Sequence, residues 1–277
     1  MNLCMRIRWL GLPAFFCLLL RLTAAEPVAY GDNPAAGKFY DINGFRMYCE
    51  IYGEGRPLLL IHGNGGKIAV FAANIPFFAE KYRVIVPDCR GRGKSKDPGD
   101  RLTYEMLADD LAELLTQLHA EPVLVVGLSD GGINGLLLTL RHPEKVAKLA
   151  VSGANLRPEA AAFVPGFWER MQGEYKSGKD QSRTTEDEKN AWKLFMLEYT
   201  GPHIALGALQ AISCPALIIC GDRDVIALEH TVQIFRNIPK AARWVMPQTG
   251  HLTARERPVE FDRGADEFFS QPSGNKK

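Results

Sequence analysis

The clearest chemical signal is one serine set between glycines, in the run Gly127-Leu128-Ser129-Asp130-Gly131-Gly132. The run follows a short apolar segment, 123–127, that is typical of a buried strand, and it precedes a segment, 133–141, that is typical of a helix. Glycines on both sides of the serine allow a sharp strand-to-helix turn from which the hydroxyl projects. We therefore predict that Ser129 is a nucleophile, whereas the same run outside this context would be an ordinary loop.

A serine hydroxyl needs a neighbouring base, and the base needs a carboxylate that orients it. His251 comes shortly after the predicted strand 243–246 and can supply the base. Asp224 stands in the loop after the predicted strand 215–220, and Asp222 is its rival two residues earlier. We favour Asp224, because a residue further into the loop is better placed to reach a histidine on the neighbouring loop.

Attack on a carbonyl also requires two donors for the oxygen that becomes negative. The backbone amide of Asp130, the residue after the nucleophile, is the first candidate. The second is expected from the loop after the predicted strand 57–62, which reads His62-Gly63-Asn64-Gly65-Gly66 and whose glycines allow a sharp turn. We expect the amide of Asn64 to complete this oxyanion hole.

The candidate residues follow predicted strands, and most of these strands are separated by predicted helices. The first two strands are joined by Asn43-Gly44, which is typical of a two-residue hairpin turn. Short β-rich runs predict strands over 39–42, 46–52, 57–62, 84–87, 123–127, 146–152, 215–220 and 243–246. Helical patterns cover 104–118, 133–141 and 228–238. This alternation predicts the α/β class with a mostly parallel sheet.

The alternation stops between residues 157 and 210, where no strand is predicted but charged helical segments lie around 167–176 and 186–199. A connection of this length is usually functional, so we interpret it as a helical cap inserted over an active site. The alternative is a surface excursion with no role in substrate choice. The core then consists of residues 26–156 and 211–277, the second part ending in a polar tail.

Five motifs together resemble those of the α/β-hydrolase superfamily. They are the serine turn, the His62-Gly63 loop, the run from Asp88 to Ser95, the run Gly221-Asp222-Arg223-Asp224, and Gly250-His251. The resemblance extends over about 39–269 outside the insert, and the chain order Ser, Asp, His matches it. It implies a sheet of eight strands with the second antiparallel to the rest, and a helical cap after the sixth strand.

Three positions depart from the commonest pattern of that superfamily. Cys89 and Arg92 stand where an apolar residue and a histidine are frequent, and Asp130 stands where Met or Gln is common. A carboxylate beside the developing oxyanion would oppose the reaction. We therefore expect the side chain of Asp130 to point away from it.

The expected reaction is acyl transfer to water, with a small-molecule carboxylesterase as its simplest form. Amidases or aminopeptidases, carbon-carbon bond hydrolases and perhydrolases of similar fold remain alternatives, and so does a non-catalytic ligand-binding protein on the same scaffold. Dehalogenases and epoxide hydrolases resemble one another in carrying Asp where this chain has Ser129, which argues against both. An aminopeptidase would need carboxylates for the substrate amine, and Glu159, Glu169 and Glu198 are candidates. His203 could approach the site from the cap.

The first 25 residues are typical of a secretory signal peptide. Arg6 and Arg8 precede an apolar run, 9–20, and Thr23-Ala24-Ala25 supplies small residues for cleavage after Ala25. The run is well short of the roughly 20 residues that a membrane-spanning helix needs, although an uncleaved anchor is the alternative. We expect export to the periplasm or the medium.

Charge is nearly balanced, with 33 Lys and Arg against 32 Asp and Glu, and loss of the three arginines in 1–25 leaves 30 against 32. There is no basic surplus that would favour nucleic acid or an anionic membrane.

No spacing of Cys and His predicts a metal site, and no phosphate-binding or dinucleotide motif predicts a cofactor. Cys49 and Cys89 either form a disulfide or stay free and buried.

Overall fold

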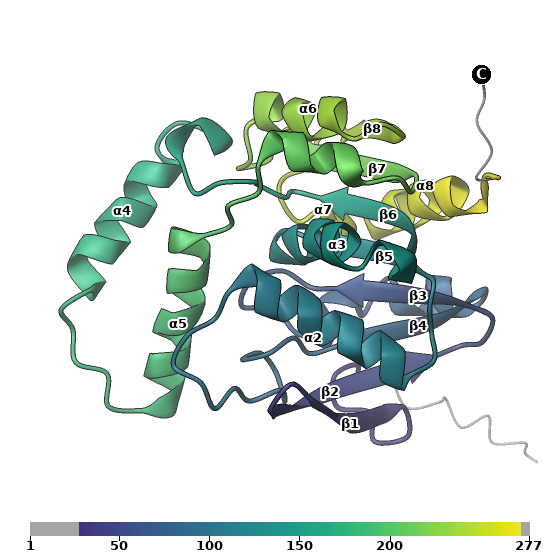
Figure 1. Ribbon diagram of the computed structural model, residues 1–277, viewed down its shortest axis with the longest axis horizontal. Helices are drawn as coiled ribbons and strands as arrows, with labels where there is room; N and C mark the ends of the chain where they lie inside the picture. The colour runs from purple at the N-terminus through teal and green to yellow at the C-terminus, as the bar shows by residue number, and fades with distance from the viewer. Residues whose placement is uncertain (1–27, 273–277) are drawn as a thin grey trace, which may run out of the picture.

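The computed structural model describes residues 28–272. Its centre is an eight-stranded sheet in the order β1-β2-β4-β3-β5-β6-β7-β8 (Figure 1). β2 pairs antiparallel with both of its neighbours, and all other neighbouring strands pair parallel. The strands are β1 (Gly37–Ile42), β2 (Phe45–Tyr52), β3 (Arg56–Ile61), β4 (Tyr82–Pro87), β5 (Val123–Leu128), β6 (Val146–Ser152), β7 (Ala216–Gly221) and β8 (Ala241–Met246). The α/β class, the eight strands and the antiparallel second strand are confirmed.

Helices cover both faces of this sheet. The helices of the described residues are α1 (Ile75–Ala79), α2 (Tyr104–Gln117), α3 (Asp130–Arg141), α4 (Phe167–Gly178), α5 (Glu186–Thr200), α6 (Leu228–Asn237), α7 (Thr253–Glu256) and α8 (Pro258–Ser270), of which α4 and α5 belong to the insert described below. Along β3, Leu58 and Leu60 pack in the cluster that contains α1 and α8, whereas Leu59 and Ile61 pack in the cluster that contains α2 and α3. Because successive side chains of a strand face opposite ways, a strand covered on both faces is apolar throughout.

The helix after the serine begins three residues earlier than the sequence predicts, at Asp130 rather than 133. Glycine is a weak helix former, which is why a pattern of side chains misses this first turn. Close packing requires it, however: a Cβ on Gly131 would lie 2.0 Å from the carbonyl oxygen of Ile61. A Cβ on Gly132 would lie 2.9 Å from the side chain of Val151. The glycines therefore let α3 start directly against the sheet.

The sheet changes winding direction between β3 and β5. After β3 the chain continues to β4 on one side of it, whereas after β5 the chain continues to β6 on the other side. The two connections therefore lead to opposite edges of the sheet. Loops that leave the carboxyl ends of such neighbouring strands diverge and open a crevice between them, which is where open α/β sheets bind ligands. The loop beginning at His62 and the turn at Ser129 both lie at this point.

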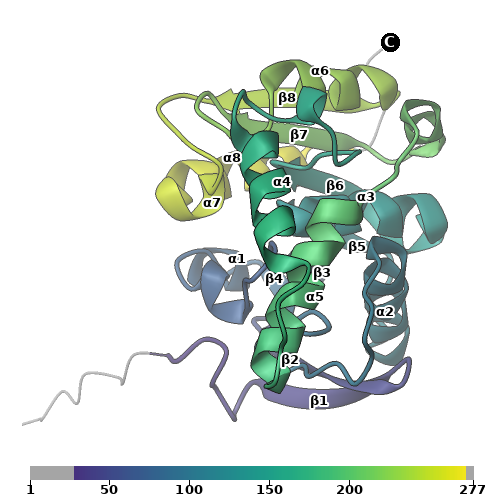
Figure 2. The same ribbon diagram turned by 90° about the vertical axis from the view of Figure 1, so that its left-hand side faces the viewer.

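The segment between β6 and β7 carries α4 and α5, which lie beside each other beyond the carboxyl ends of the strands (Figures 1 and 2). Stacked aromatic rings join the two helices: the ring of Tyr199 on α5 lies 5.4 Å from Trp168 and 4.5 Å from Tyr175 on α4. No strand falls within 157–210, as predicted, although Phe163 makes an isolated bridge to Ile226.

The predicted signal peptide, 1–25, lies outside the described residues. Within 28–272 no helix combines the length and the apolarity needed to cross a bilayer.

Candidate active site

Ser129 occupies a strained turn between β5 and α3. Its backbone has φ 55° and ψ −120°, a region that side-chain-bearing residues seldom adopt. A Cβ on Gly127 would lie 2.2 Å from the carbonyl oxygen of Gly131, so the turn can close only with glycine at position 127. The amide of Ser129 donates to the carbonyl of Ser152 on β6 at 2.7 Å, which ties the turn to the neighbouring strand.

Three predicted residues meet at this turn. Nε2 of His251 lies 2.8 Å from Oγ of Ser129, and Nδ1 of His251 lies 2.7 Å from Oδ1 of Asp224. The three residues come from the loops after β5, β7 and β8, at one edge of the sheet. The geometry is that of a hydroxyl, an imidazole and a carboxylate in series.

The two aspartates after β7 have different surroundings. Asp224 is buried, and its Oδ1 also accepts the amide of Ile226 at 3.0 Å. Asp222 is exposed, and its Oδ1 accepts the amide of Thr249 at 3.0 Å. Hydrogen bonds from the backbone of Gln248 and Thr249 hold the pKa of Asp222 below its usual range. Asp224 therefore contacts the histidine, and Asp222 braces the loop that carries it.

Gly153, directly after β6, makes room for the histidine. A Cβ at this position would lie 2.8 Å from Cε1 and 2.9 Å from Nδ1 of His251. Its φ of +65° is itself a conformation that favours glycine. No local pattern marks this residue, because its role depends on a contact across nearly one hundred residues.

The loop after β3 lies against Ser129. A Cβ on Gly63 would lie 3.0 Å from Cβ of Ser129, and His62 braces the loop from behind. Nε2 of His62 accepts the amide of Cys89 at 3.0 Å, and burial, together with the charge of Arg92, lowers the pKa of His62 to about 4. The imidazole is thus neutral, with Nδ1 donating to the carbonyl of Gly63 at 2.8 Å.

The backbone amides of Asn64 and Asp130 flank this junction. Neither donates a hydrogen bond to another group of the chain between residues 28 and 272. The first amides of a helix lack partners within it, so that of Asp130 is available to a ligand.

Buried charged groups surround the same point. The carboxylate of Asp130 accepts Nη2 of Arg92 at 3.1 Å and the hydroxyl of Tyr104 at 2.8 Å, so both of its oxygens are engaged. Burial raises the pKa of Asp130, against the opposing effects of Arg92 and Tyr104. Glu198 of α5 accepts Nδ2 of Asn64 at 3.2 Å, and burial followed by the charge of Asp130 raises its pKa. The sequence marked Arg92 as a departure from the common pattern, but its partner was not foreseen.

The pKa of His251 reflects this acidic surrounding. Burial lowers it, but the hydrogen bond and the charge of Asp224, followed by the charges of Glu198 and Asp130, outweigh burial and raise the pKa overall. A base with a raised pKa is well matched to proton transfer near neutral pH.

Other candidates from the sequence lie elsewhere. Glu159 pairs with Arg157, and Glu169 caps its own helix at Gly166, so of the three glutamates proposed for an amine only Glu198 reaches the site. His203 is exposed and makes no hydrogen bond to the serine, histidine and aspartate described above.

Cys49 and Cys89 are both buried and free, so the disulfide is not formed. Burial raises the pKa of both thiols, that of Cys89 to about 12.

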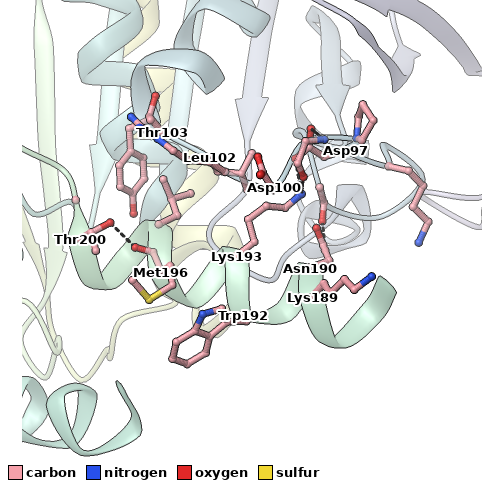
Figure 3. A pocket seen from close by; sticks show the side chains of 18 of the residues that line it. Asp97, Asp100, Leu102, Thr103, Lys189, Asn190, Trp192, Lys193, Met196 and Thr200 are labelled. Atoms are coloured by element: carbon pink, nitrogen blue, oxygen red, sulfur yellow. Dashed lines mark hydrogen bonds and ion pairs between the residues drawn. The ribbon is translucent and has the colours of Figure 1, made fainter. Parts of the chain in front are cut away.

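A separate cavity of about 1080 Å³ lies between α5 and the segment 96–105, which runs into the start of α2 (Figure 3). Neither Ser129 nor His251 lines it. Its walls are tied together by polar contacts from α5: Lys193 binds Asp97 and donates to the carbonyl of Gly99 at 2.6 Å, and Asn190 donates to the carbonyl of Gly91 at 2.7 Å. These contacts fasten the insert to the core.

Comparison with known proteins decides the family. A family described as alpha/beta hydrolase fold matches residues 56–185. The 2-hydroxymuconate semialdehyde hydrolase of Pseudomonas sp. (strain CF600) is 34% identical over 277 aligned residues, which cover 87% of this chain and 96% of that protein. The chain belongs to the α/β-hydrolase superfamily.

Further relatives of this α/β hydrolase are also named as hydrolases. Serine hydrolase BPHL of Mus musculus is 26% identical over 263 residues, covering 88% of this chain and 90% of that one. A thermophilic esterase from Thermogutta terrifontis matches with a TM-score of 0.70 at 25% identity, covering 84% and 98% of the two chains. The protein is thus a hydrolytic enzyme of the α/β fold. One of these relatives is named for 2-hydroxymuconate semialdehyde and another as an esterase, so their names do not agree on one substrate.

Proposed function

We propose that this protein is an exported serine hydrolase that cleaves a carboxylic ester, or a similar acyl bond, of a small molecule. The observation that carries the proposal is the series of two short contacts, Ser129 to His251 and His251 to Asp224, in loops that leave the same edge of the sheet. Export rests on the signal-like sequence of 1–25 alone.

In the proposed reaction Oγ of Ser129 attacks the carbonyl carbon while Nε2 of His251 takes its proton. Asp224 fixes the tautomer and stabilises the imidazolium. The amides of Asn64 and Asp130 bind the carbonyl oxygen as it becomes negative. His251 then returns the proton to the leaving alcohol, and a water molecule, activated by the same histidine, releases the acid from the serine.

The decisive experiment is labelling of the purified mature protein with a fluorophosphonate, which reacts with an activated serine. We expect labelling of the wild type and none of Ser129→Ala. Turnover of p-nitrophenyl esters of increasing chain length would then measure the acyl pocket. A folded wild type that neither labels nor turns over an ester would favour the alternative of a ligand-binding protein.

The names of the relatives leave open which bond a serine hydrolase of this family cleaves. The same preparation should be assayed on 2-hydroxymuconate semialdehyde, the compound in the name of the Pseudomonas relative, and on anilides. Turnover of either compound above that of the esters would replace the esterase assignment while leaving the serine mechanism in place.

A substrate that carries an amine is a second candidate, and Glu198 favours it. This carboxylate is half-buried beside the site, and it forms no ion pair with a basic residue within 28–272. A substrate ammonium would supply the missing cation. We expect a free aminoacyl ester to show a KM at least tenfold below that of its N-acetyl derivative, and Glu198→Gln to remove the difference. Equal KM values for the two esters in the wild type would dismiss this candidate.

A further inference from the structure

Arg92 lies between the two loops whose amides flank the serine. Its side chain is 2% exposed, and one nitrogen, Nη2, donates both to Oδ1 of Asn64 at 2.9 Å and to Oδ2 of Asp130 at 3.1 Å. Nη1 donates to the carbonyl of Arg90 at 3.1 Å, which holds the guanidinium in its own loop. One buried cation therefore joins the residue after the nucleophile to the residue across the crevice.

The contact with Asp130 has an electrostatic consequence. Asp130 begins the helix that follows Ser129, and its charge acts on His251, so the carboxylate is within electrostatic reach of the reacting groups. An unpaired carboxylate there would disfavour the negative charge that develops during acyl transfer, since electrostatic interactions are strong in a buried site. The guanidinium of Arg92 binds one oxygen and balances the negative charge, while the hydroxyl of Tyr104 donates to the other oxygen.

The contact with Asn64 has a geometric consequence. Oδ1 of Asn64 accepts Arg92 and the amide of Gly65, while Nδ2 donates to the carbonyl of Leu194 at 3.2 Å and to Glu198. The asparagine is held by the core on one side and by α5 on the other. These contacts fix the peptide between Gly63 and Asn64, which lies next to the contact of Gly63 with Ser129.

We propose that Arg92 is a positioning residue for the oxyanion hole. It holds the peptides of Asn64 and Asp130 in a common orientation and cancels the negative charge of Asp130. The inference rests on the proposed function, because it concerns the stabilisation of the same acyl-transfer transition state.

The test compares Arg92→Met with Arg90→Met in the full mature protein. Arg90 is an equally buried arginine two residues away that pairs with Asp110 at 2.7 Å and with Asp97 at 3.3 Å, and contacts neither Asn64 nor Asp130. Both variants lose a buried ion pair and should lose stability. We expect only Arg92→Met to lower kcat for a p-nitrophenyl ester, by about 100-fold, with KM changed less than threefold. Assays run well below the Tm of each variant separate this loss from unfolding.

A transition-state mimic gives a readout that a merely structural role would not move. A trifluoromethyl ketone forms a hemiketal oxyanion on the serine, so its inhibition constant should rise in Arg92→Met by the same factor by which kcat/KM falls. Arg92→Lys keeps the positive charge but lacks the planar guanidinium with its several donors, and it serves as the test if the methionine variant does not fold. We expect it to lose kcat by at least tenfold.

A double variant tests the cancellation of charge. Arg92→Met with Asp130→Asn should recover at least tenfold of the kcat lost in Arg92→Met alone, because no unpaired carboxylate remains. Retention of kcat within threefold in Arg92→Met would overturn the proposal, and so would a loss of the same size in Arg90→Met. Absence of Ser129-dependent labelling in the wild type would instead reject the proposed function itself.

Discussion

The carboxylate of Asp224 and the imidazole of His251 are joined by a contact of 2.7 Å, and the amide of Ile226 steadies the same carboxylate oxygen. The neighbouring Asp222 makes no such contact, since it accepts the amide of Thr249 instead. The two aspartates lie two residues apart in one loop, but Asp224 orients the histidine whereas Asp222 braces the loop that carries it.

A pair of conservative variants separates those tasks. Asp224→Asn should lower kcat by about 10³ to 10⁴, because the amide favours the wrong tautomer of the histidine. Asp222→Asn should lower it by no more than about tenfold, since only a brace of the loop is weakened. Steady-state kinetics on one p-nitrophenyl ester measure both. Equal losses in the two variants would contradict the assignment of Asp224.

A methyl group at Gly153 should displace the histidine. The added Cβ would lie within 2.9 Å of two ring atoms of His251, so Gly153→Ala should lower kcat by at least about 100-fold. Gly166→Ala is the matched control, because Gly166 also has a positive φ, +87°, but nothing lies within 4 Å of the position of its Cβ. Both substitutions strain the backbone, and only one of them crowds the site. A control variant as inactive as Gly153→Ala would show that strain alone accounts for the loss.

The pH dependence of kcat/KM should report the charge of Glu198. His251 must be neutral to accept the proton, so activity falls at acid pH as it becomes protonated, and its raised pKa moves this limb upward. Glu198→Gln removes one of the negative charges that raise that pKa while keeping an acceptor for Asn64. We expect the acid limb to move to lower pH by a few tenths of a unit to about one unit.

The control for this shift is Glu174→Gln, on the exposed side of α4, where the limb should stay in place. An acid limb that is unchanged in Glu198→Gln would mean that Glu198 is already neutral in that pH range.

Stability should depend on a buried carboxylate in α8. Burial raises the pKa of Asp262 to about 7, against the opposing hydrogen bond from Nδ2 of Asn74 at 2.7 Å. The native state then holds a proton that the unfolded chain releases near pH 4. This contribution to stability is complete below pH 4 and is lost as the pH rises through about 7.

Asp262→Asn should therefore match the wild type at pH 4 and exceed it above pH 7, by up to a few kcal/mol in the free energy of unfolding. Oδ1 of Asn74 is buried and without a partner in the described part of the chain, so an amide at 262 has an acceptor available. Urea titrations at pH 4, 6 and 8 measure the difference. A gap that stays constant across these pH values would show that the carboxyl does not titrate in this range.

The signal peptide yields a direct prediction about the mature chain. Expression of the full sequence in a bacterium with a secretory pathway should give a product whose N-terminus is Glu26, as read by intact mass or N-terminal sequencing. A product in the membrane fraction that retains residues 1–25 would favour the uncleaved anchor.

Much of this architecture is readable from local pattern. Strands covered on both faces are short apolar runs. Their alternation with helical patterns along the chain predicts a mostly parallel sheet even where the pairing of the strands is unknown. Ser129, His251 and Asp224 could be proposed together because each follows a strand end, where a parallel sheet gathers its loops, and the structure brings the three side chains into contact. The preference for Asp224 over Asp222 required only the length of the loop.

The remainder depends on contacts that no local pattern records. Arg92 and Asp130 are 38 residues apart, and the sequence presented them as two unrelated departures rather than as one ion pair. The sequence indicates that a carboxylate at Asp130 would oppose the developing oxyanion, but it does not indicate that Arg92 balances the charge of that carboxylate. Gly153 looks like any glycine after a strand, because the atom it must avoid belongs to a side chain 98 positions later.

The contacts between α5 and the loop 90–99 bear on how such an enzyme can diversify. Lys193 and Asn190 are bound to Asp97, Gly99 and Gly91, so the insert is fastened to a loop that precedes it by about 95 positions. A new insert acquired by recombination would leave the buried Asp97 without its lysine, and a new loop would leave the lysine without its aspartate. The two segments should consequently be inherited as one unit, and an engineered chimera should exchange both together.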